Sequence, residues 1–190
     1  LDYFKKNFKI ITQSDILEHI YENKNIPKNS ILLTFDDGLK DHFQYVFPEL
    51  SKRNLQGLFF PPARPILESK LLDVNAIHYI LASAKNIEEL LQDFNSQCLL
   101  HGIAQSDLDK SWKELAYPKK DIAEVVFFKS MLQRELPEEI RENIVGILFE
   151  KYVECSESEL AQDIYMSVDE LKELIAQGMY VGSHADRKST

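Results

Sequence analysis

The segment Ile31–Gly38, with the sequence Ile-Leu-Leu-Thr-Phe-Asp-Asp-Gly, constrains the fold more than any other part of the chain. Its apolar residues do not alternate with polar ones, which is typical of a parallel strand covered on both faces. Asp36, Asp37 and Gly38 then end the strand, because Asp-Gly favours a turn. Ligands of parallel α/β proteins meet the carboxyl ends of strands, so carboxylates at this point are candidates for chemistry.

Two interpretations of this pair of carboxylates fit the pattern. The first is a turn without chemistry, because Asp-Gly is common wherever the backbone needs a positive φ. The second is a metal site, because a cation relieves the repulsion between neighbouring carboxylates. The pattern alone gives the two interpretations comparable weight.

The residues before this segment predict a strand and a helix. Phe8–Thr12 is a short β-prone run. We expect a helix to follow it as far as about Glu22, with Ser14 and Asp15 capping its first turn.

The residues after the segment predict a βαβ unit. Lys40–Lys52 carries apolar residues at helical spacing, with a kink or an early end at Pro48. Leu58–Phe60 is the second core strand. A strand, a helix and a strand in this order form one right-handed parallel unit.

The middle of the chain has mainly helical periodicity. Pro61-Pro62-Ala-Arg-Pro65 breaks the α/β pattern, and residues 71 to 163 contain no repeat or low-complexity tract. The predicted helices are Val74–Ser83, Ile87–Leu100, Gln105–Leu115, Asp121–Leu136, Pro137–Glu154 and Glu157–Gln162. We interpret this block as an insertion that serves as a lid or as a partner-binding subdomain.

The end of the chain returns to an α/β pattern. Ser167 and Glu170 have the spacing of a capping box at the start of a helix, and Gly178 is the expected helix terminator. Met179–Val181 is then a short strand, and His184 follows it closely.

Thr34-Phe35-Asp36-Asp37-Gly38 resembles the first motif of the polysaccharide deacetylases, the NodB-homology or carbohydrate esterase family four group. The resemblance covers roughly residues 1–66 and about 165–186. It implies an incomplete or distorted (β/α) barrel of the NodB-homology type with a large all-helical insertion. The expected divisions are 1–66 for the first part of the α/β domain, 67–164 for the insertion, and 165–190 for a truncated return to the α/β domain.

The resemblance also implies roles for three residues. Asp37 matches the family's metal-binding aspartate, Asp36 its general base, and His184 the first metal-binding histidine of the second motif. The expected cofactor is a divalent metal, most simply zinc, with cobalt or nickel as alternatives. We expect Asp37 and His184 to meet because each follows a strand of one sheet, and we expect these strands to be neighbours.

The second motif departs from the family at its end. Lys188 stands where the second metal-binding histidine is expected, and a lysine ammonium is a poor metal ligand. Ala185 replaces a small hydroxyl residue, and Asp186 is an alternative oxygen ligand. The third metal ligand and the general acid are therefore not identified by the sequence.

Three functions follow from these features. The leading hypothesis is a metal-dependent hydrolase that removes N-acetyl or O-acetyl groups from a polysaccharide or glycoconjugate, with an N-acetylated carbohydrate as substrate. The alternative is a non-catalytic carbohydrate-binding or scaffold member, or an inactive fragment of such an enzyme. A weaker hypothesis is phosphoryl transfer with Asp36 as nucleophile, although no phosphate-binding loop is visible.

Composition excludes some partners. The 190 residues include 31 acidic and 22 basic side chains, a net charge of -9, which argues against nucleic acid or an anionic membrane as partner. No apolar run has transmembrane length. The absence of a visible signal peptide slightly favours the cytoplasm, although the chain begins at Leu1 and a missing leader is left open as an alternative. The oligomeric state is not indicated.

The remaining reactive residue types favour structural roles. Cys98 is expected in the core and Cys155 near a helix end. His42 is expected on a solvated helix face rather than in the pocket. His78 is expected to be packed or at the boundary of a helix face, and His101 to lie at a helix end, where the helix dipole favours it.

Overall fold

The computed structural model describes residues 1–117 and 120–184, and Lys188, Ala185 and Asp186 lie outside them. The chain forms two compact units. One consists of Leu1–Lys70 together with the chain from Leu160 onward, and the other is Leu71–Glu159. The first is mixed α/β and the second is helical throughout its described residues.

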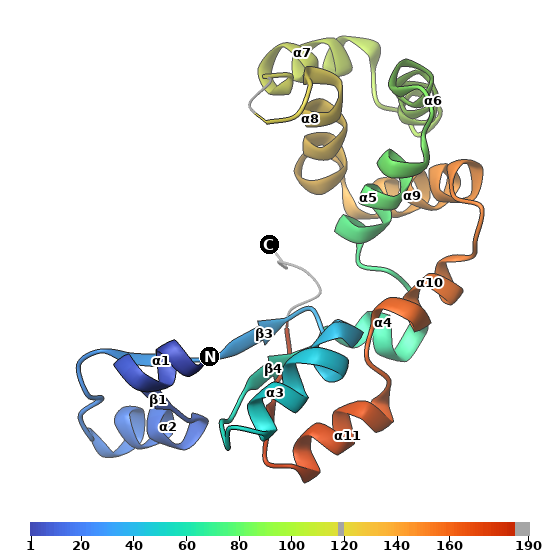
Figure 1. Cartoon of the computed structure of the whole chain (residues 1–190). Coiled ribbons are helices and arrows are strands. Elements are labelled where there is room, and N and C mark those ends of the chain that lie inside the picture. The colour runs from blue at the N-terminus through green and yellow to red at the C-terminus, as the bar shows by residue number, and fades with distance from the viewer. Residues whose placement is uncertain (118–119, 185–190) are drawn as a thin grey trace. The chain divides into compact units, whose positions relative to one another are not determined.

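The α/β unit is built from short elements (Figure 1). In chain order they are α1 (Asp2–Asn7), β1 (Lys9–Ile11), α2 (Gln13–Glu22), β2 (Ser30–Leu32), β3 (Thr34–Asp36), the π-helix η1 (His42–Val46), α3 (Phe47–Ser51), β4 (Leu58–Phe60), α4 (Ala63–Glu68), most of α10 (Glu157–Ile164), α11 (Val168–Ala176) and β5 (Tyr180–Val181). The predicted strand Leu58–Phe60 is confirmed as β4. The predicted strand Met179–Val181 is confirmed as β5 except for its first residue.

Two parallel sheets contain these strands. β1 pairs with β2, and a second sheet has the order β3-β4-β5 with β4 in the middle. In the second sheet Phe35 lies opposite Phe59, and Phe59 opposite Val181. Within the described residues neither sheet closes into a barrel.

The segment Ile31–Gly38 is not the single buried strand that the sequence predicts. The strand is divided at Leu33, so that β2 pairs with β1 and β3 pairs with β4. Its residues are only partly covered, and Thr34 and Asp36 are exposed. A continuous apolar run cannot distinguish one strand in one sheet from two short strands that serve different sheets.

The core of the α/β unit lies against β4. Phe59 is fully buried and meets Leu50 of α3 and Leu174 of α11. Phe35 of β3 stacks on Phe59 with ring centroids 4.9 Å apart. Burying a side chain as large as phenylalanine contributes roughly 1.5–3 kcal/mol, so this cluster is a main source of stability for the sheet that carries the strand ends.

The segment around Pro48 shows how a helix continues past a proline. η1 precedes α3, and Pro48 occupies the first turn of α3. A proline ring clashes with the carbonyl four residues before it in a regular α-helix. The wider π turn removes that constraint, so the predicted kink takes the form of a change of helix type rather than an end.

The cap of α2 differs from the prediction. Thr12, not Ser14, is the N-cap residue. Its hydroxyl accepts the Asp15 amide at 3.3 Å, and the Asp15 carboxylate accepts the Thr12 amide at 2.7 Å. The Thr12 amide and the Thr12 hydroxyl both donate to the Asp15 carboxylate, and these two hydrogen bonds lower the pKa of Asp15. Thr12 directly follows β1 in extended conformation, which is the backbone geometry that an N-cap requires.

The predicted capping box of α11 is confirmed. Ser167 accepts the Glu170 amide at 3.2 Å, and Glu170 accepts the Ser167 amide at 2.7 Å. At the other end, Gly178 has φ of 83° and its amide bonds Ile175 O at 3.0 Å, while the next amide bonds Leu174 O at 3.0 Å. This is a Schellman motif, which aims the chain from α11 directly into β5.

The helical unit contains α5 (Asp73–Ser83), α6 (Ile87–Leu100), α7 (Gln105–Leu115), α8 (Ala123–Ser130), the π-helix η2 (Met131–Glu135) and α9 (Glu138–Tyr152), followed by the start of α10. The predicted bounds of α6 and α7 are confirmed. The predicted helix Asp121–Leu136 is divided into α8 and η2, and its first residues lie outside the helix.

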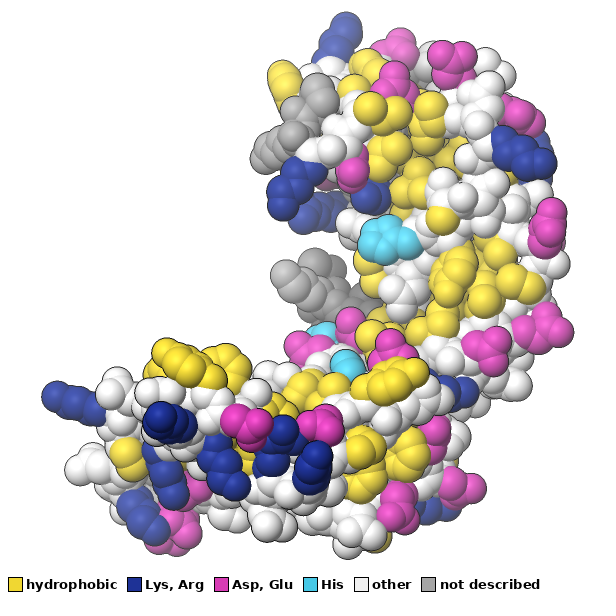
Figure 2. All heavy atoms as spheres, in the orientation of Figure 1, with side chains coloured by type: hydrophobic (Ala, Val, Ile, Leu, Met, Phe, Trp, Pro, Cys, Tyr) yellow, Lys and Arg dark blue, Asp and Glu magenta, His cyan; other side chains and the backbone are white. Residues whose placement is uncertain are grey.

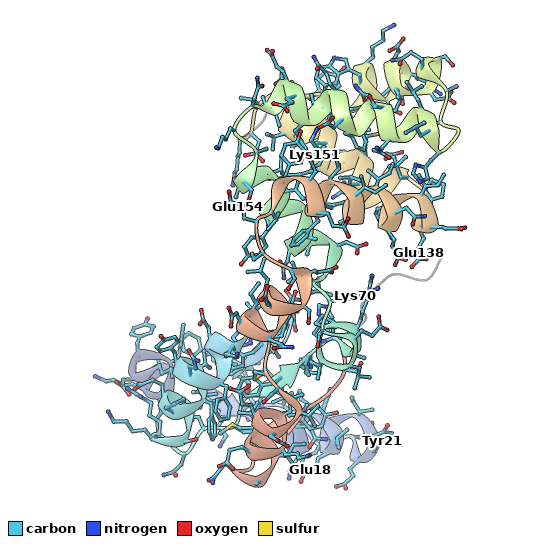
Figure 3. The ribbon with its side chains drawn as sticks, turned by 90° about the vertical axis from the view of Figure 1, so that its right-hand side faces the viewer. Glu18, Tyr21, Lys70, Glu138, Lys151 and Glu154 are labelled. Atoms are coloured by element: carbon cyan, nitrogen blue, oxygen red, sulfur yellow. The ribbon has the colours of Figure 1, made fainter. Side chains whose placement is uncertain are left out.

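Aromatic packing and buried polar contacts hold the helical unit together. The Phe94 ring meets those of Phe127 and Phe128 edge to face, with centroids 6.1 and 5.4 Å away. Arg141 Nε lies 3.0 Å from Asp73 Oδ2, which links α9 to α5. Glu138 and Lys151 mark the two ends of α9 in Figure 3.

The cysteines have the environments that the sequence predicts. Cys98 is fully buried in α6, where burial raises the pKa of its thiol to about 12, and Cys155 is exposed. Both are free thiols. None of the helices in the described ranges is long and apolar enough to cross a membrane.

Candidate metal and catalytic site

The turn after β3 is fixed by its neighbours on both sides. Asp37 and Gly38 adopt φ values of 67° and 62°. A Cβ on Gly38 would lie 2.7 Å from the Pro61 Cβ, so only glycine fits this position. The Gly38 carbonyl accepts the Met166 amide at 2.8 Å. The backbone that carries the two carboxylates is therefore held between the chain after β4 and the chain before α11.

His184 is placed by an extension of the parallel pairing beyond β5. The Gly182 amide bonds Phe59 O at 2.8 Å, and the His184 amide bonds Pro61 O at 3.1 Å. His184 also forms a parallel bridge with Pro62. The histidine thus lies at the carboxyl end of the sheet because its own backbone follows the end of β4.

Asp37 and His184 meet at this edge of the sheet. Asp37 Oδ1 and His184 Nδ1 are 3.1 Å apart, and their side chains are 43% and 42% exposed. The sequence predicted that the two strands are neighbours. This prediction is wrong, because β4 lies between β3 and β5. The side chains still reach each other because each projects beyond the end of its strand.

The separation of these two atoms fits neighbouring ligands of one metal ion. Ligand atoms at about 2.1 Å from zinc lie about 3.0–3.4 Å from each other in octahedral or tetrahedral geometry. The carboxylate oxygen and imidazole nitrogen are also suitable donor types for zinc, cobalt or nickel. Among the described residues no set of three histidine, cysteine, aspartate or glutamate side chains is close enough to hold a metal. Asp37 and His184 offer two donors of suitable type, and their separation of 3.1 Å is also that of a direct hydrogen bond between them.

Asp36 is the last residue of β3 and is exposed. Because successive side chains of a strand alternate in direction, it stands apart from the Phe35 ring in the core. Its exposure leaves the carboxylate accessible to water and to a ligand arriving from solvent.

His42 packs against the sheet near the acidic turn, so the predicted solvated helix face is wrong for it. Its ring contacts those of Phe35 and Phe59, with centroids 5.6 and 6.2 Å away. Its Nδ1 is buried without a hydrogen-bond partner. Burial lowers the pKa of His42, and the carboxylates of Asp37, Asp41 and Asp36 oppose that shift. The signal for its position was its place one turn after the Asp-Asp-Gly motif, on a helix that must pack against the sheet.

The other histidines do not join this group. His101 is the C-cap of α6, as predicted. His78 is exposed on α5, so a packed position is wrong for it. Figure 2 shows histidine side chains beside acidic ones on the surface of the α/β unit.

Comparisons of the chain with protein-family models, with curated proteins and with solved structures found no match.

Proposed function

We propose that this chain is a metal-dependent carbohydrate deacetylase of the NodB-homology type, which removes N-acetyl or O-acetyl groups from a polysaccharide or glycoconjugate. The observation that carries the proposal is the contact of Asp37 with His184 at 3.1 Å, at the carboxyl end of a parallel sheet. We further propose that the two small sheets are parts of an incomplete barrel of that family's type.

Three residues have roles in this proposal. Asp37 and His184 hold the divalent metal, for which zinc is the first candidate, with cobalt or nickel as alternatives. When bound, such a metal lowers the pKa of a water molecule toward neutrality and polarises a carbonyl oxygen. Asp36, which is exposed at the end of β3, would act as general base toward such a water.

The backbone around the site supports the proposed role of Asp37 and His184 as ligands. The close approach of Gly38 to Pro61 and the hydrogen bond of His184 N–H to Pro61 O restrict the backbone on both sides of the Asp37–His184 contact. Preorganised ligands reduce the reorganisation that metal binding and reaction would otherwise need.

Metal binding tests the roles of Asp37 and His184 separately from catalysis. Zinc titrated calorimetrically into the chain should bind with a stoichiometry near one. Asp37→Asn and His184→Ala should each weaken the affinity at least tenfold, because each removes a direct ligand. His78→Ala is the matched control, since it removes an exposed histidine of the helical unit. Equal affinities for His184→Ala and His78→Ala would reject the site.

Acetate release tests the role of Asp36. With zinc present, the chain should release acetate from tetra-N-acetylchitotetraose, and Asp36→Asn should abolish release while zinc still binds. An unchanged rate in Asp36→Asn would show that another group is the base.

A carbohydrate-binding protein without turnover is the second candidate. The presence of Lys188 where the family has a metal-binding histidine favours it. In that case the oligosaccharide binds the wild-type chain, but no acetate is released at any zinc concentration.

A further inference from the structure

The α/β unit contains a cavity next to the turn that carries Asp37. Its volume is about 350 Å³. One wall is formed by α4 and the residue after it, including Ile66 and Ser69, and the other by the chain from α10 to α11, including Tyr165 and Met166. These two walls are the segments at which the chain leaves the α/β unit and returns to it.

The cavity wall is attached directly to the metal-binding turn. The Met166 amide donates to Gly38 O at 2.8 Å, and Leu39 forms an antiparallel bridge with Tyr165. The Lys40 ammonium donates to the carbonyl of Gln162, which also lines the cavity. The cavity and the candidate metal site therefore share one continuous piece of backbone.

The lining of the cavity selects for an uncharged ligand. None of the described residues that form it is an aspartate, glutamate, lysine, arginine or histidine. Ile66, Met166 and Val168 supply apolar surface, whereas Ser69 and Gln162 supply hydrogen-bonding groups. A charged ligand would lose hydration here without gaining a partner of opposite charge.

The volume of the cavity and the presence of Tyr165 in its lining restrict the class of ligand further. Cavities that bind small molecules begin at about 300 Å³, so this one holds a group no larger than about one sugar ring. Tyr165 lines the cavity and is almost fully buried. A sugar ring combines apolar C–H faces with hydroxyl groups, which matches a lining of this mixed character.

We propose that this cavity is a saccharide subsite, which binds an uncharged sugar ring adjacent to the one whose acetyl group reaches Asp37 and His184. This inference rests on the proposed deacetylase function for the identity of the ligand. Binding in the subsite does not require the metal, because no residue of its lining is one of the two proposed metal ligands.

The test is a titration of the full chain with tetra-N-acetylchitotetraose in the presence of a chelator. Binding is monitored by NMR through changes in the amide chemical shifts. We expect saturable binding, with shift changes at Ser69 and Gln162. Ile66→Trp fills the cavity and should weaken binding at least tenfold. Leu67→Trp is the matched control, because Leu67 is the next residue of α4, is 76% exposed and does not line the cavity.

Val168→Trp provides a second filling variant should Ile66→Trp fail to fold, since Val168 is 44% exposed and tolerates a larger side chain better. Absence of saturable binding by the wild-type chain would overturn the subsite. Equal affinities of the filling variant and Leu67→Trp, or shift changes confined to other residues, would also overturn it. Zinc affinity, measured separately, reports on the proposed function, so failure of one proposal is distinguishable from failure of the other.

Discussion

The imidazole of His42 experiences two opposing influences on its charge. Burial against Phe35 and Phe59 favours the neutral ring, whereas the carboxylates of Asp37, Asp41 and Asp36 favour the imidazolium. Burial is the larger influence, and the pKa lies below the ordinary value of 6.5. His42 is therefore a neutral ring beside a cluster of negative charge at neutral pH.

This lowered pKa predicts a specific dependence of stability on pH. Between the lowered pKa and 6.5 the unfolded chain binds more protons than the folded chain, so the free energy of unfolding falls as the pH is lowered through this window. His42→Phe keeps an aromatic ring against Phe35 and Phe59 but cannot bind a proton. In this variant, the fall in the free energy of unfolding that His42 causes should be absent. Urea unfolding from about pH 7.5 to 5.5 in metal-free buffer measures both slopes. Parallel pH profiles for the two proteins would contradict the assignment.

At this scale the sequence predicted some positions and missed others. Asp37 and His184 could be placed after strands because Gly-rich turns and strand ends have a local signature. Their contact is present, while their role as metal ligands stays a prediction. The place of His42 one turn after the Asp-Asp-Gly motif indicates that it lies near the strand end. Its burial depends in addition on a contact with Phe59 of another strand, which no local pattern predicts.

Short strands and special helix types are the features of this chain that local patterns describe least well. The division of Ile31–Gly38 into β2 and β3 depends on which strand each half pairs with. The change from η1 to α3 depends on how Pro48 is accommodated. By contrast, the cap of α11 and the bounds of α6 were predictable, because caps and apolar periodicity are local signals.

Two glycines, one inside a helix and one directly after a helix, should respond oppositely to substitution by alanine. Gly146 lies inside α9, is exposed, and has no atom within 4 Å of an added Cβ. Gly146→Ala should therefore stabilise the helical unit by roughly 0.5–1 kcal/mol. Gly178 also has open space around it but adopts φ of 83°, so Gly178→Ala should destabilise the α/β unit by about 1–2 kcal/mol.

Chemical denaturation of both variants, monitored by far-UV circular dichroism, checks the signs. Because space is open at both positions, packing does not explain a difference between them. Destabilisation by both substitutions would mean that the added methyl group perturbs α9 in a way that backbone propensity does not describe.

At the scale of the whole molecule, the boundaries predicted at 66/67 and 164/165 lie four and five residues from those of the two compact units, at 70/71 and 159/160. The helical unit spans Leu71–Glu159, so α4 and the part of α10 from Leu160 belong to the α/β unit. Periodicity marks where helices occur, but it does not tell which core a helix packs into. For this reason the expected insertion included three of the residues that line the cavity, Ser69, Ala161 and Gln162.

The helical unit has a core of its own, which predicts that it folds without the rest of the chain. Its fully buried side chains, contributed by α5, α6, α8 and α9, include Ile80, Leu90, Phe94, Phe128 and Leu148. A domain of this size buries more than about 60% of the surface that its unfolded chain exposes. A fragment of residues 71–159 should therefore show a cooperative thermal transition by circular dichroism at 222 nm. Phe94→Ala should lower the free energy of unfolding by about 3–5 kcal/mol and abolish the cooperative transition. Leu100→Ala, at a side chain that is 77% exposed, should leave the transition almost unchanged. A gradual melt of the unmodified fragment, or equal effects of the two substitutions, would mean that the helices depend on the α/β unit for their packing.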